Sequence, residues 1–209
     1  MTNVIVKTGH YFLKNDFLYD LYQNIVGGVA YRSRIIEDLM KYEKPMFLDL
    51  GCGTATVCRI ISKNIKYFGV DNSKIYLNKA KINFPKHSFT QADLGKSGWS
   101  KNIFINDPVV ATGLGLLHHL DNNQAIDFLA GCRSLLNNNS LLFTVDPVII
   151  TGTGKVAKWF AENDRGQYVR NPKELIALFE ISGFKPSYQI RKNQFRIPLD
   201  TIEITALIK

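Results

Sequence analysis

The 209-residue chain has a formal net charge of +8, with 45% hydrophobic and 21% charged residues. This composition supports one globular core and excludes a largely disordered chain. No apolar stretch reaches the about 20 residues that cross a bilayer, and the amino terminus lacks the pattern of a signal peptide, so we expect no membrane span and a cytoplasmic location.

The basic residues are scattered along most of the sequence, without an arginine-rich run or interleaved aromatic residues. This distribution favours a solvated basic surface over a nucleic-acid interface. The three cysteines, Cys52, Cys58 and Cys132, lack the C-x-x-C spacing of zinc and redox sites. We therefore expect free, buried thiols.

The first 44 residues are rich in tyrosine and end in an amphipathic stretch, Tyr31–Tyr42, which predicts a helical cap. From residue 45 to 209 we expect one structural unit. In it, short β-type runs alternate with helical patterns, which predicts an α/β fold with a mostly parallel sheet. The five clearest strand candidates are Met46–Leu50, Tyr67–Val70, Ser88–Thr90, Pro108–Thr112 and Leu141–Val145.

Two of the helices between the strands have recognisable ends. Asp121 and Gln124 have the spacing of a capping box at the start of one helix. Asn171 can cap the other, and Gly183 can terminate it. Two alternating stretches then predict a closing pair of strands with one antiparallel edge: Tyr188–Arg191 and Ile202–Ile208.

The most specific motif is the run Phe47–Ala55, in which an apolar strand leads directly into a tight glycine turn and then a predicted helix. Gly51 and Gly53 allow the backbone to turn sharply and a ligand to approach it closely. A nucleotide-like ligand is expected at this turn.

Three carboxylates follow successive strands. Asp49 precedes the glycine turn, Asp71 ends the next strand 22 positions later, and Asp93 follows the third strand. An acidic residue in the position of Asp71 accepts hydrogen bonds from ribose hydroxyls, and Asp93 could accept from an adenine amine. Because ligands of open α/β sheets bind at the carboxyl ends of the strands, the three acids should converge on one crevice.

These motifs resemble those of the class I S-adenosylmethionine-dependent methyltransferases. Residues 48–54 are similar to the first motif of that family, residues 69–71 to its acidic loop, residues 92–93 to its adenine loop, and residues 113–121 to the segment after its fourth strand. The resemblance implies a Rossmann-like, doubly wound sheet of seven strands with the last strand antiparallel and helices on both faces. It also implies S-adenosylmethionine as cofactor and S-adenosylhomocysteine as product.

The resemblance assigns roles to matched positions: Asp49 near the cofactor's amino group, Gly51 and Gly53 under its methionine moiety, Asp71 at the ribose and Asp93 at the adenine. The full set of residues expected to line the cofactor is Asp49, Gly51, Cys52, Gly53, Thr54, Asp71, Asn72, Ala92, Asp93, Leu94, Gly113 and Leu114.

Two departures from the family pattern and one competing class also bear on the site. Ala55 stands where the family often has a third glycine, and residues 137–139 are asparagines in place of a Pro-Gly-Gly turn. A nicotinamide dehydrogenase would carry G-x-G-x-x-G, whereas position 56 is Thr56. The dehydrogenase is therefore disfavoured.

Three residues are candidates for proton transfer. His118 and His119 follow the fourth strand, and Asp146 follows the fifth. We hypothesise that His119 deprotonates the acceptor with help from Asp146, since a carboxylate can orient an imidazole and stabilise its charged form. The alternative is that either histidine only hydrogen-bonds the backbone. No metal site is expected, because adjacent histidines point in different directions and have no third ligand nearby.

Residues 163–170, together with residues 22–28, resemble a subgroup of small bacterial methyltransferases, similar to types 11 and 12. Arg165 and Arg170 could bind a phosphate or carboxylate of the acceptor through bidentate hydrogen bonds. The alternative is that Asp164 and Arg165 pair within the protein. Residues 151–160, which include Trp159, are predicted to form a lid over the acceptor.

The sequence thus predicts a methyltransferase that acts on a small molecule, by O-methylation of a sugar or another hydroxylated metabolite. Methylation of RNA or DNA is the second reading, favoured by the basic charge but not by the fourth-strand loop, which lacks an Asn-Pro-Pro-Tyr or Asp-Pro-Pro-Tyr run. A protein that binds S-adenosylmethionine without catalysis is the third.

Overall fold

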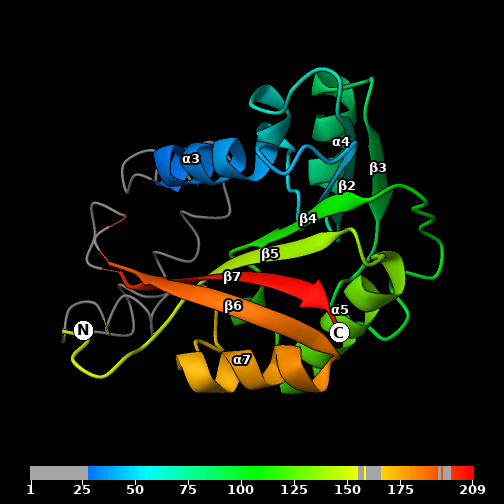
Figure 1. The fold of residues 1–209 in the computed structure, drawn as a ribbon. Helices are drawn as coiled ribbons and strands as arrows, with labels where there is room; N and C mark the ends of the chain where they lie inside the picture. Colours follow the sequence, from blue (N-terminus) through cyan, green and yellow to red (C-terminus); the bar gives the residue numbers. More distant parts are fainter. Residues whose placement is uncertain (1–27, 155–157, 159–165, 193, 195–198) are drawn as a thin grey trace.

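The fold is built on one seven-stranded sheet, seen in a computed structural model that describes residues 28–154, 158, 166–192, 194 and 199–209 (Figure 1). The strand order is β3-β2-β1-β4-β5-β7-β6. Strands β1 to β5 are parallel to one another, and β7 runs antiparallel to both β5 and β6. The strands are β1 Met46–Leu50, β2 Lys66–Asp71, β3 Ser88–Gln91, β4 Val109–Leu114, β5 Leu141–Pro147, β6 Phe184–Arg191 and β7 Thr201–Ile208.

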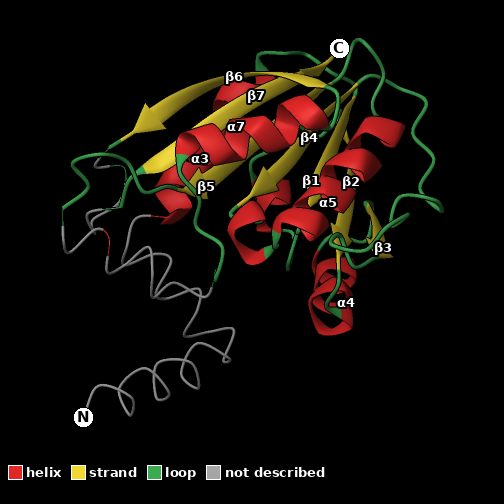
Figure 2. Cartoon of the chain, turned by 90° about the horizontal axis from the view of Figure 1, so that it is seen from below, coloured by secondary structure: helices red, strands yellow, loops and turns green. Residues whose placement is uncertain are grey.

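Helices cover both faces of this sheet (Figure 2). The α-helices are α3 Gly28–Met40, α4 Lys74–Asn83, α5 Asn122–Leu135 and α7 Pro172–Ile181, and short 3-10 helices lie at η1 Thr56–Arg59 and η2 Leu117–His119. The arrangement confirms the Rossmann-like, doubly wound fold with an antiparallel last strand. None of the helices in the described ranges is long and apolar enough to cross a membrane.

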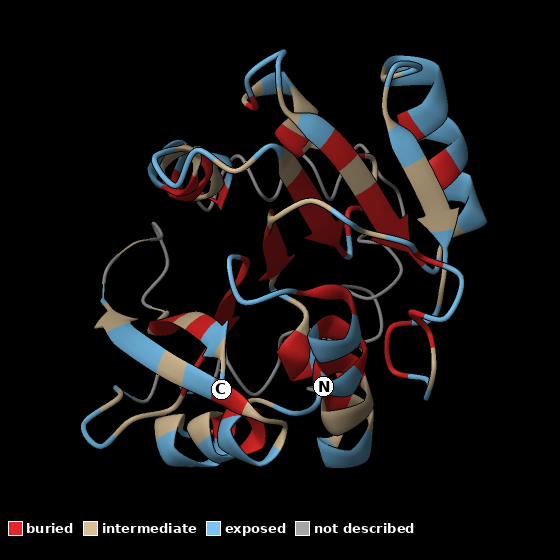
Figure 3. Cartoon of the chain, turned by 45° about the vertical axis from the view of Figure 1, so that its right-hand side comes forward, coloured by how far each residue is buried: buried red, intermediate tan, exposed pale blue. Residues whose placement is uncertain are grey.

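Two hydrophobic clusters hold the layers together, one on each face. One joins the sheet to α5 and α7 through side chains such as Phe128 and Phe179, and the other joins it to α3, η1 and α4 through Ile36 and Leu77. The central strands β1, β4 and β5 are buried along almost their whole length (Figure 3). Burial on both faces explains why these strands have nearly continuous apolar sequences.

Short sequence patterns determine where several of the helices begin. The predicted capping box of Asp121 and Gln124 begins α5, and the predicted cap Asn171 begins α7, where it forms a second capping box with Glu174. The helix predicted after the glycine turn, in contrast, is only the single turn η1. The strand predicted at residues 188–191 begins earlier, at Phe184, directly after the helix-ending Gly183.

The predicted amino-terminal cap is described only from Gly28 onward. Its helix, α3, packs on the sheet through Tyr31, Ile35, Ile36 and Leu39. Residues 1–27 lie outside the described residues, so the division of the chain at residues 44 and 45 stays a prediction.

The tight contact between Trp99 and α5 gives a test of the packing. The Trp99 indole lies 8% exposed against this helix, where its Nε1 donates to the Phe128 carbonyl at 3.3 Å, and a Cβ added at Gly131 would fall on the indole ring. Gly131→Ala should therefore lower the free energy of unfolding by about 1–3 kcal/mol, although alanine is the better helix former by about 1 kcal/mol.

Urea unfolding measures this difference. Asn123→Ala, at an exposed position of the same helix, is the matched control and should leave stability unchanged or slightly higher. Equal stabilisation by both substitutions would contradict the contact.

Candidate functional site

The glycine turn after β1 is fastened to the end of β2. Gly51 and Gly53 have φ angles of 81° and 54°, in the left-handed region that glycine adopts without strain. The amides of Gly51 and Cys52 donate to the Val70 carbonyl at 2.8 and 3.0 Å. A Cβ added at Gly53 would meet nothing within 4 Å, so open space adjoins the turn.

Asp71 holds the turn from the neighbouring strand. Its Oδ2 accepts from the Gly53 amide and its Oδ1 from the Ser73 amide, both at 2.8 Å. A carboxylate oxygen has two lone pairs, so each oxygen keeps one acceptor position for a ligand. Asp71, which is predicted to bind the ribose, is therefore held in a fixed orientation and can still accept hydrogen bonds.

Ala55 occupies a position that favours glycine. Its φ and ψ are 59° and 37°, in the left-handed region, which costs an L-residue about 1–2 kcal/mol. The alanine side chain is buried against the α3 face of the sheet. The methyl group is accommodated, but the chain continues only as the short η1.

Asp49 is a buried carboxylate, 4% exposed. It accepts from the Tyr67 hydroxyl at 2.7 Å and from Thr112 Oγ1 at 3.1 Å. Burial raises its pKa, because removal from water disfavours the charged form. A cationic group bound beside Asp49 would stabilise that charged form, which suits the role predicted for it.

The third carboxylate, Asp93, is more accessible, with 46% of its side chain exposed. It accepts from the Gly95 amide at 3.2 Å and lies 3.4 Å from Lys96 Nζ. The Ala92 amide donates to the Asp71 carbonyl at 3.0 Å, which places the loop after β3 beside the end of β2. The three predicted acids therefore follow adjacent strands of the sheet.

The other residues predicted to line the crevice differ in exposure. Asn72 is exposed and its carbonyl accepts from Gln91 Nε2 at 2.9 Å. Leu94 is buried in the core beneath α5. Of the residues at the turn and at the end of β4, Cys52 and Gly113 are buried, whereas Thr54 and Leu114 are half-buried.

Sequence reasoning missed three residues that shape this crevice. Tyr67 and Thr112 hold Asp49, and Leu116 lies over the turn, 3.5 Å from a Cβ built on Gly51. Thr112 is a polar residue in an otherwise apolar, buried strand. This exception in the sequence could have indicated that it holds a buried polar group.

The histidines after β4 are arranged differently from the prediction. The backbone N–H of His118 donates to Asp146 Oδ1 at 3.1 Å, and His118 Nδ1 lies 2.9 Å from the same oxygen. The sequence paired Asp146 with His119 instead. Because successive side chains of the 3-10 helix η2 point about 120° apart, only one of the two can face β5.

His119 is exposed, and its ring lies against that of His118, with centroids 4.1 Å apart. His118 and Asp146 are 6% and 2% exposed. Asp146 Oδ2 is buried and has no hydrogen-bond partner within the described part of the chain. Asp146 can therefore act on His119 only through His118.

Arg170 serves the protein interior and does not fit the predicted acceptor role. All three nitrogens of its buried guanidinium donate: Nη1 to the Leu117 carbonyl at 2.8 Å, Nη2 to the Leu120 carbonyl at 2.6 Å and Nε to Asn122 Oδ1 at 2.9 Å. Arg170 thereby fastens the loop that carries the histidines. Trp159, Asp164 and Arg165 lie outside the described residues.

The segment before Arg170 lies against His118. A Cβ added at Gly166 would overlap the His118 ring, and the Tyr168 amide donates to the His118 carbonyl at 3.0 Å. The segment therefore covers one side of the His118 ring. Throughout the described ranges, no group of three or more His, Cys, Asp or Glu side chains could hold a metal ion.

The thiols are all free. Burial raises the pKa of Cys58 to about 12, and it also raises the pKa of Cys52 and Cys132 well above the usual value of a thiol. A thiol with a raised pKa stays protonated at neutral pH and is a poor nucleophile. None of the three is therefore a candidate nucleophile.

Comparisons with known proteins agree with the fold described above. Residues 47–139 match the model of a family described as a methyltransferase domain. No curated protein matches the sequence.

Three solved structures illustrate the fold similarity. A TehB-like SAM-dependent methyltransferase from Corynebacterium glutamicum has a TM-score of 0.64 and 16% identity, over 93% of this chain and 97% of that one. A SAM-dependent methyltransferase from Archaeoglobus fulgidus has a TM-score of 0.66 and 15% identity, over 90% and 99%. Human N-acetylserotonin methyltransferase, in complex with SAM, has a TM-score of 0.66 and 15% identity, over 94% and 57%.

The raised pKa of Asp49 predicts a pH dependence of stability. A folded-state pKa above the unfolded one stabilises the fold below the unfolded pKa, and this contribution is lost as the pH rises through the folded pKa. Relative to Asp49→Asn, the wild type should therefore lose about 1.4 kcal/mol per pH unit between the two pKa values.

Urea unfolding of both proteins from pH 4 to 8, without ligand, measures this difference. A difference that stays flat or grows in favour of the wild type as the pH rises would contradict the assignment.

Proposed function

We propose that this chain, whose residues 47–139 match the model of a methyltransferase domain, is a class I S-adenosylmethionine-dependent enzyme that methylates a hydroxyl oxygen of a small molecule. The fold and the family match support S-adenosylmethionine as its cofactor, and methyl transfer requires a methyl acceptor as the second substrate. The observation that carries the proposal about the acceptor is the exposed His119 ring, which lies against the His118 ring that Asp146 holds.

The proposed cofactor contacts follow from the acceptor groups of the crevice. Asp71 has free lone pairs for the ribose hydroxyls while its other lone pairs hold the turn. When the positively charged amino group of the methionine moiety lies beside Asp49, it favours the ionised form of this buried carboxyl group. Asp93, half-exposed at the next strand, accepts from the adenine amine.

S-adenosylmethionine supplies an electrophilic methyl group and leaves as S-adenosylhomocysteine. A hydroxyl acceptor must lose its proton as its oxygen forms the new bond to carbon, so a base beside the acceptor lowers the barrier. His119 is the proposed base. The proton passes to the His119 imidazole. This ring lies against the His118 ring, which the Asp146 carboxyl group holds in place.

Orientation is the other contribution of the chain. A correctly placed acceptor removes about 7–11 kcal/mol of the barrier in favourable cases. Arg170 fixes the loop after β4 at the Leu117 and Leu120 carbonyls, on both sides of the two histidines. Arg170 is thus proposed as a positioning residue.

Two features support a small acceptor over a nucleic acid. Residues 113–121 lack the Asn-Pro-Pro-Tyr type of run, and the segment from Gly166 to Arg170 covers one side of His118. Bound cofactor without turnover on any acceptor would instead indicate a protein that only binds S-adenosylmethionine.

Calorimetry tests the crevice. Asp71→Asn should weaken the binding of S-adenosylmethionine and S-adenosylhomocysteine at least about tenfold, because hydrogen bonds to a charged group contribute about 1.5–3 kcal/mol. Asp107→Asn, which removes an exposed carboxylate paired with Lys66, is the control and should bind normally. Equal binding by both variants would place the ribose elsewhere.

The acceptor is found by incubating the protein with radiolabelled cofactor and fractionated cell extract. Label is expected among small hydroxylated metabolites rather than in RNA or DNA. On the acceptor so identified, His119→Asn should lower turnover about 10²–10⁴-fold, the usual range for a general base, with cofactor affinity retained. Unchanged turnover would remove His119 from the mechanism, and label in nucleic acid would replace the proposed acceptor class.

A further inference from the structure

The net charge of the protein is concentrated at one end of the sheet, contrary to the scatter read from the sequence. Residues 56–92 hold seven of the 26 lysines and arginines but only one of the 18 acids, and that acid, Asp71, is buried. This stretch therefore contributes +6 of the net charge of +8. It folds as η1, β2, α4 and β3, which lie together beside the β3 edge (Figure 1).

All seven basic side chains of this stretch are exposed: Arg59, Lys63, Lys66, Lys74, Lys79, Lys81 and Lys86. We call this surface the lysine edge. Lys66 is paired with Asp107 at 3.0 Å, from the loop before β4. Six of the seven residues are lysines, which act as point charges and do not read bases through a bidentate guanidinium.

Helix α4 adds an apolar ridge at the centre of the lysine edge. Leu77 and Ala80 are its buried residues, and they pack on the sheet. Ile75 and Ile82 are 67% and 79% exposed. At 100° per residue, these two isoleucines point almost directly away from Leu77 and Ala80.

The lysines of α4 flank this ridge on both sides. By the same helical rotation, Lys74 and Lys81 lie on one side of Ile75 and Ile82, and Lys79 lies on the other. An outward apolar ridge between rows of lysine is the pattern of a helix that lies on an anionic bilayer, with the apolar side chains inserted and the charges at the head groups.

We propose that the lysine edge, with Ile75 and Ile82 at its centre, docks the protein on the surface of an anionic lipid bilayer. The six excess positive charges complement acidic head groups, and the two isoleucines lose their contact with water on insertion. A phosphate backbone would use the lysines but would gain nothing from the isoleucines. The proposal does not depend on the acceptor that the enzyme methylates.

The geometry leaves the active site open on such a surface. Helix α4 begins three residues after Asp71, so the glycine turn and Asp71 border the start of the docked helix. The histidines follow β4, which is separated from β2 by β1. Docking through α4 thus leaves the loop after β4 uncovered.

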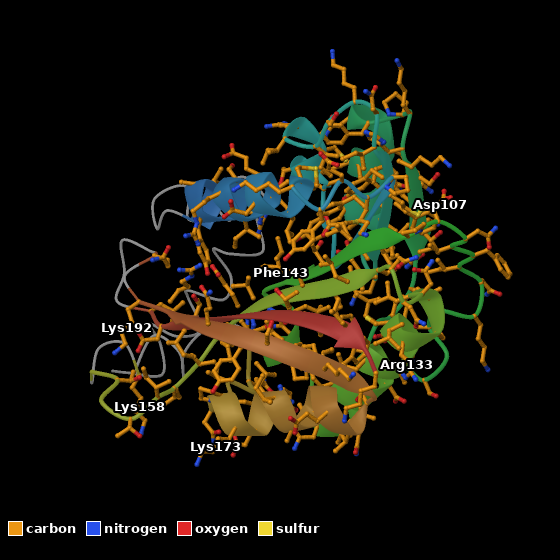
Figure 4. The ribbon with its side chains drawn as sticks, in the orientation of Figure 1. Asp107, Arg133, Phe143, Lys158, Lys173 and Lys192 are labelled. Atoms are coloured by element: carbon orange, nitrogen blue, oxygen red, sulfur yellow. The ribbon has the colours of Figure 1, made fainter. Side chains whose placement is uncertain are left out.

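Co-sedimentation with vesicles tests the proposal. The full chain should bind vesicles of phosphatidylcholine with phosphatidylglycerol but not vesicles of phosphatidylcholine alone, and binding should weaken as salt rises. Replacing Lys74 and Lys81 together by glutamine should weaken binding about 25-fold, at about fivefold per lysine. The control is a pair of lysines away from α4, Lys173 and Lys192, whose replacement by glutamine should have little effect (Figure 4).

The isoleucines distinguish a bilayer from other polyanions. Ile75→Ser with Ile82→Ser should weaken vesicle binding at least about tenfold, whereas Ile181→Ser, on an equally exposed isoleucine of α7, should not. Binding to a single-stranded RNA that needs the lysines but not the isoleucines, without vesicle binding, would overturn the proposal and make the lysine edge a nucleic-acid surface. Absence of both kinds of binding would also overturn it.

Each variant is first compared with the wild type in melting temperature and in affinity for S-adenosylmethionine. Unchanged values show that the fold and crevice are intact, so loss of vesicle binding then reports on the docking surface alone. Conversely, failure of the chain to bind S-adenosylmethionine would count against the proposed function and not against docking.

Discussion

The crevice depends on one carboxylate that joins two strands. Asp71 ends β2 and accepts from the amide of Gly53 in the turn after β1. Parallel strands end at the same edge of a sheet, so this hydrogen bond forms only when β1 and β2 are paired in register. The turn therefore takes its shape from the sheet as a whole. Because the same carboxylate is the proposed partner of the ribose, the proposal links the stability of the turn to ligand binding.

Buried polar groups gather at the carboxyl ends of the central strands, on an otherwise apolar frame. Asp49 is held by Tyr67 from β2 and Thr112 from β4, and Asp146 is held by His118 from the loop after β4. A buried polar group is costly unless it is hydrogen-bonded, and these groups share partners across strands. Of the two carboxyl groups, Asp49 has a pKa that burial raises, and it lies where the amino group of the cofactor is proposed to bind.

Features that depend on the spacing of residues along the sequence could be predicted. Features that depend on the direction in which a side chain points could not. The glycine turn and the capping box of Asp121 and Gln124 depend on residues a few positions apart, and the three acids stand at the ends of strands with clear patterns. The choice between His118 and His119 depended on the pitch of a 3-10 turn, which no spacing reveals. Arg170 resembled a ligand residue because its carbonyl partners are about 50 positions away. The charges of the lysine edge lie in one stretch of the sequence, residues 56–92, but they are spread singly along it, and the outward direction of Ile75 and Ile82 follows only from the packing of α4.

The short helix η1 has a consequence for ligand choice. In dinucleotide-binding folds, a full helix starts at the glycine turn, and its macrodipole favours the pyrophosphate. Here only Thr56–Arg59 follow in a single turn, and the nearby charges are carboxylates. Such an end offers little attraction to a phosphate. The short η1 therefore favours the proposed ligand, a sulfonium with a zwitterionic tail, over nicotinamide and flavin dinucleotides.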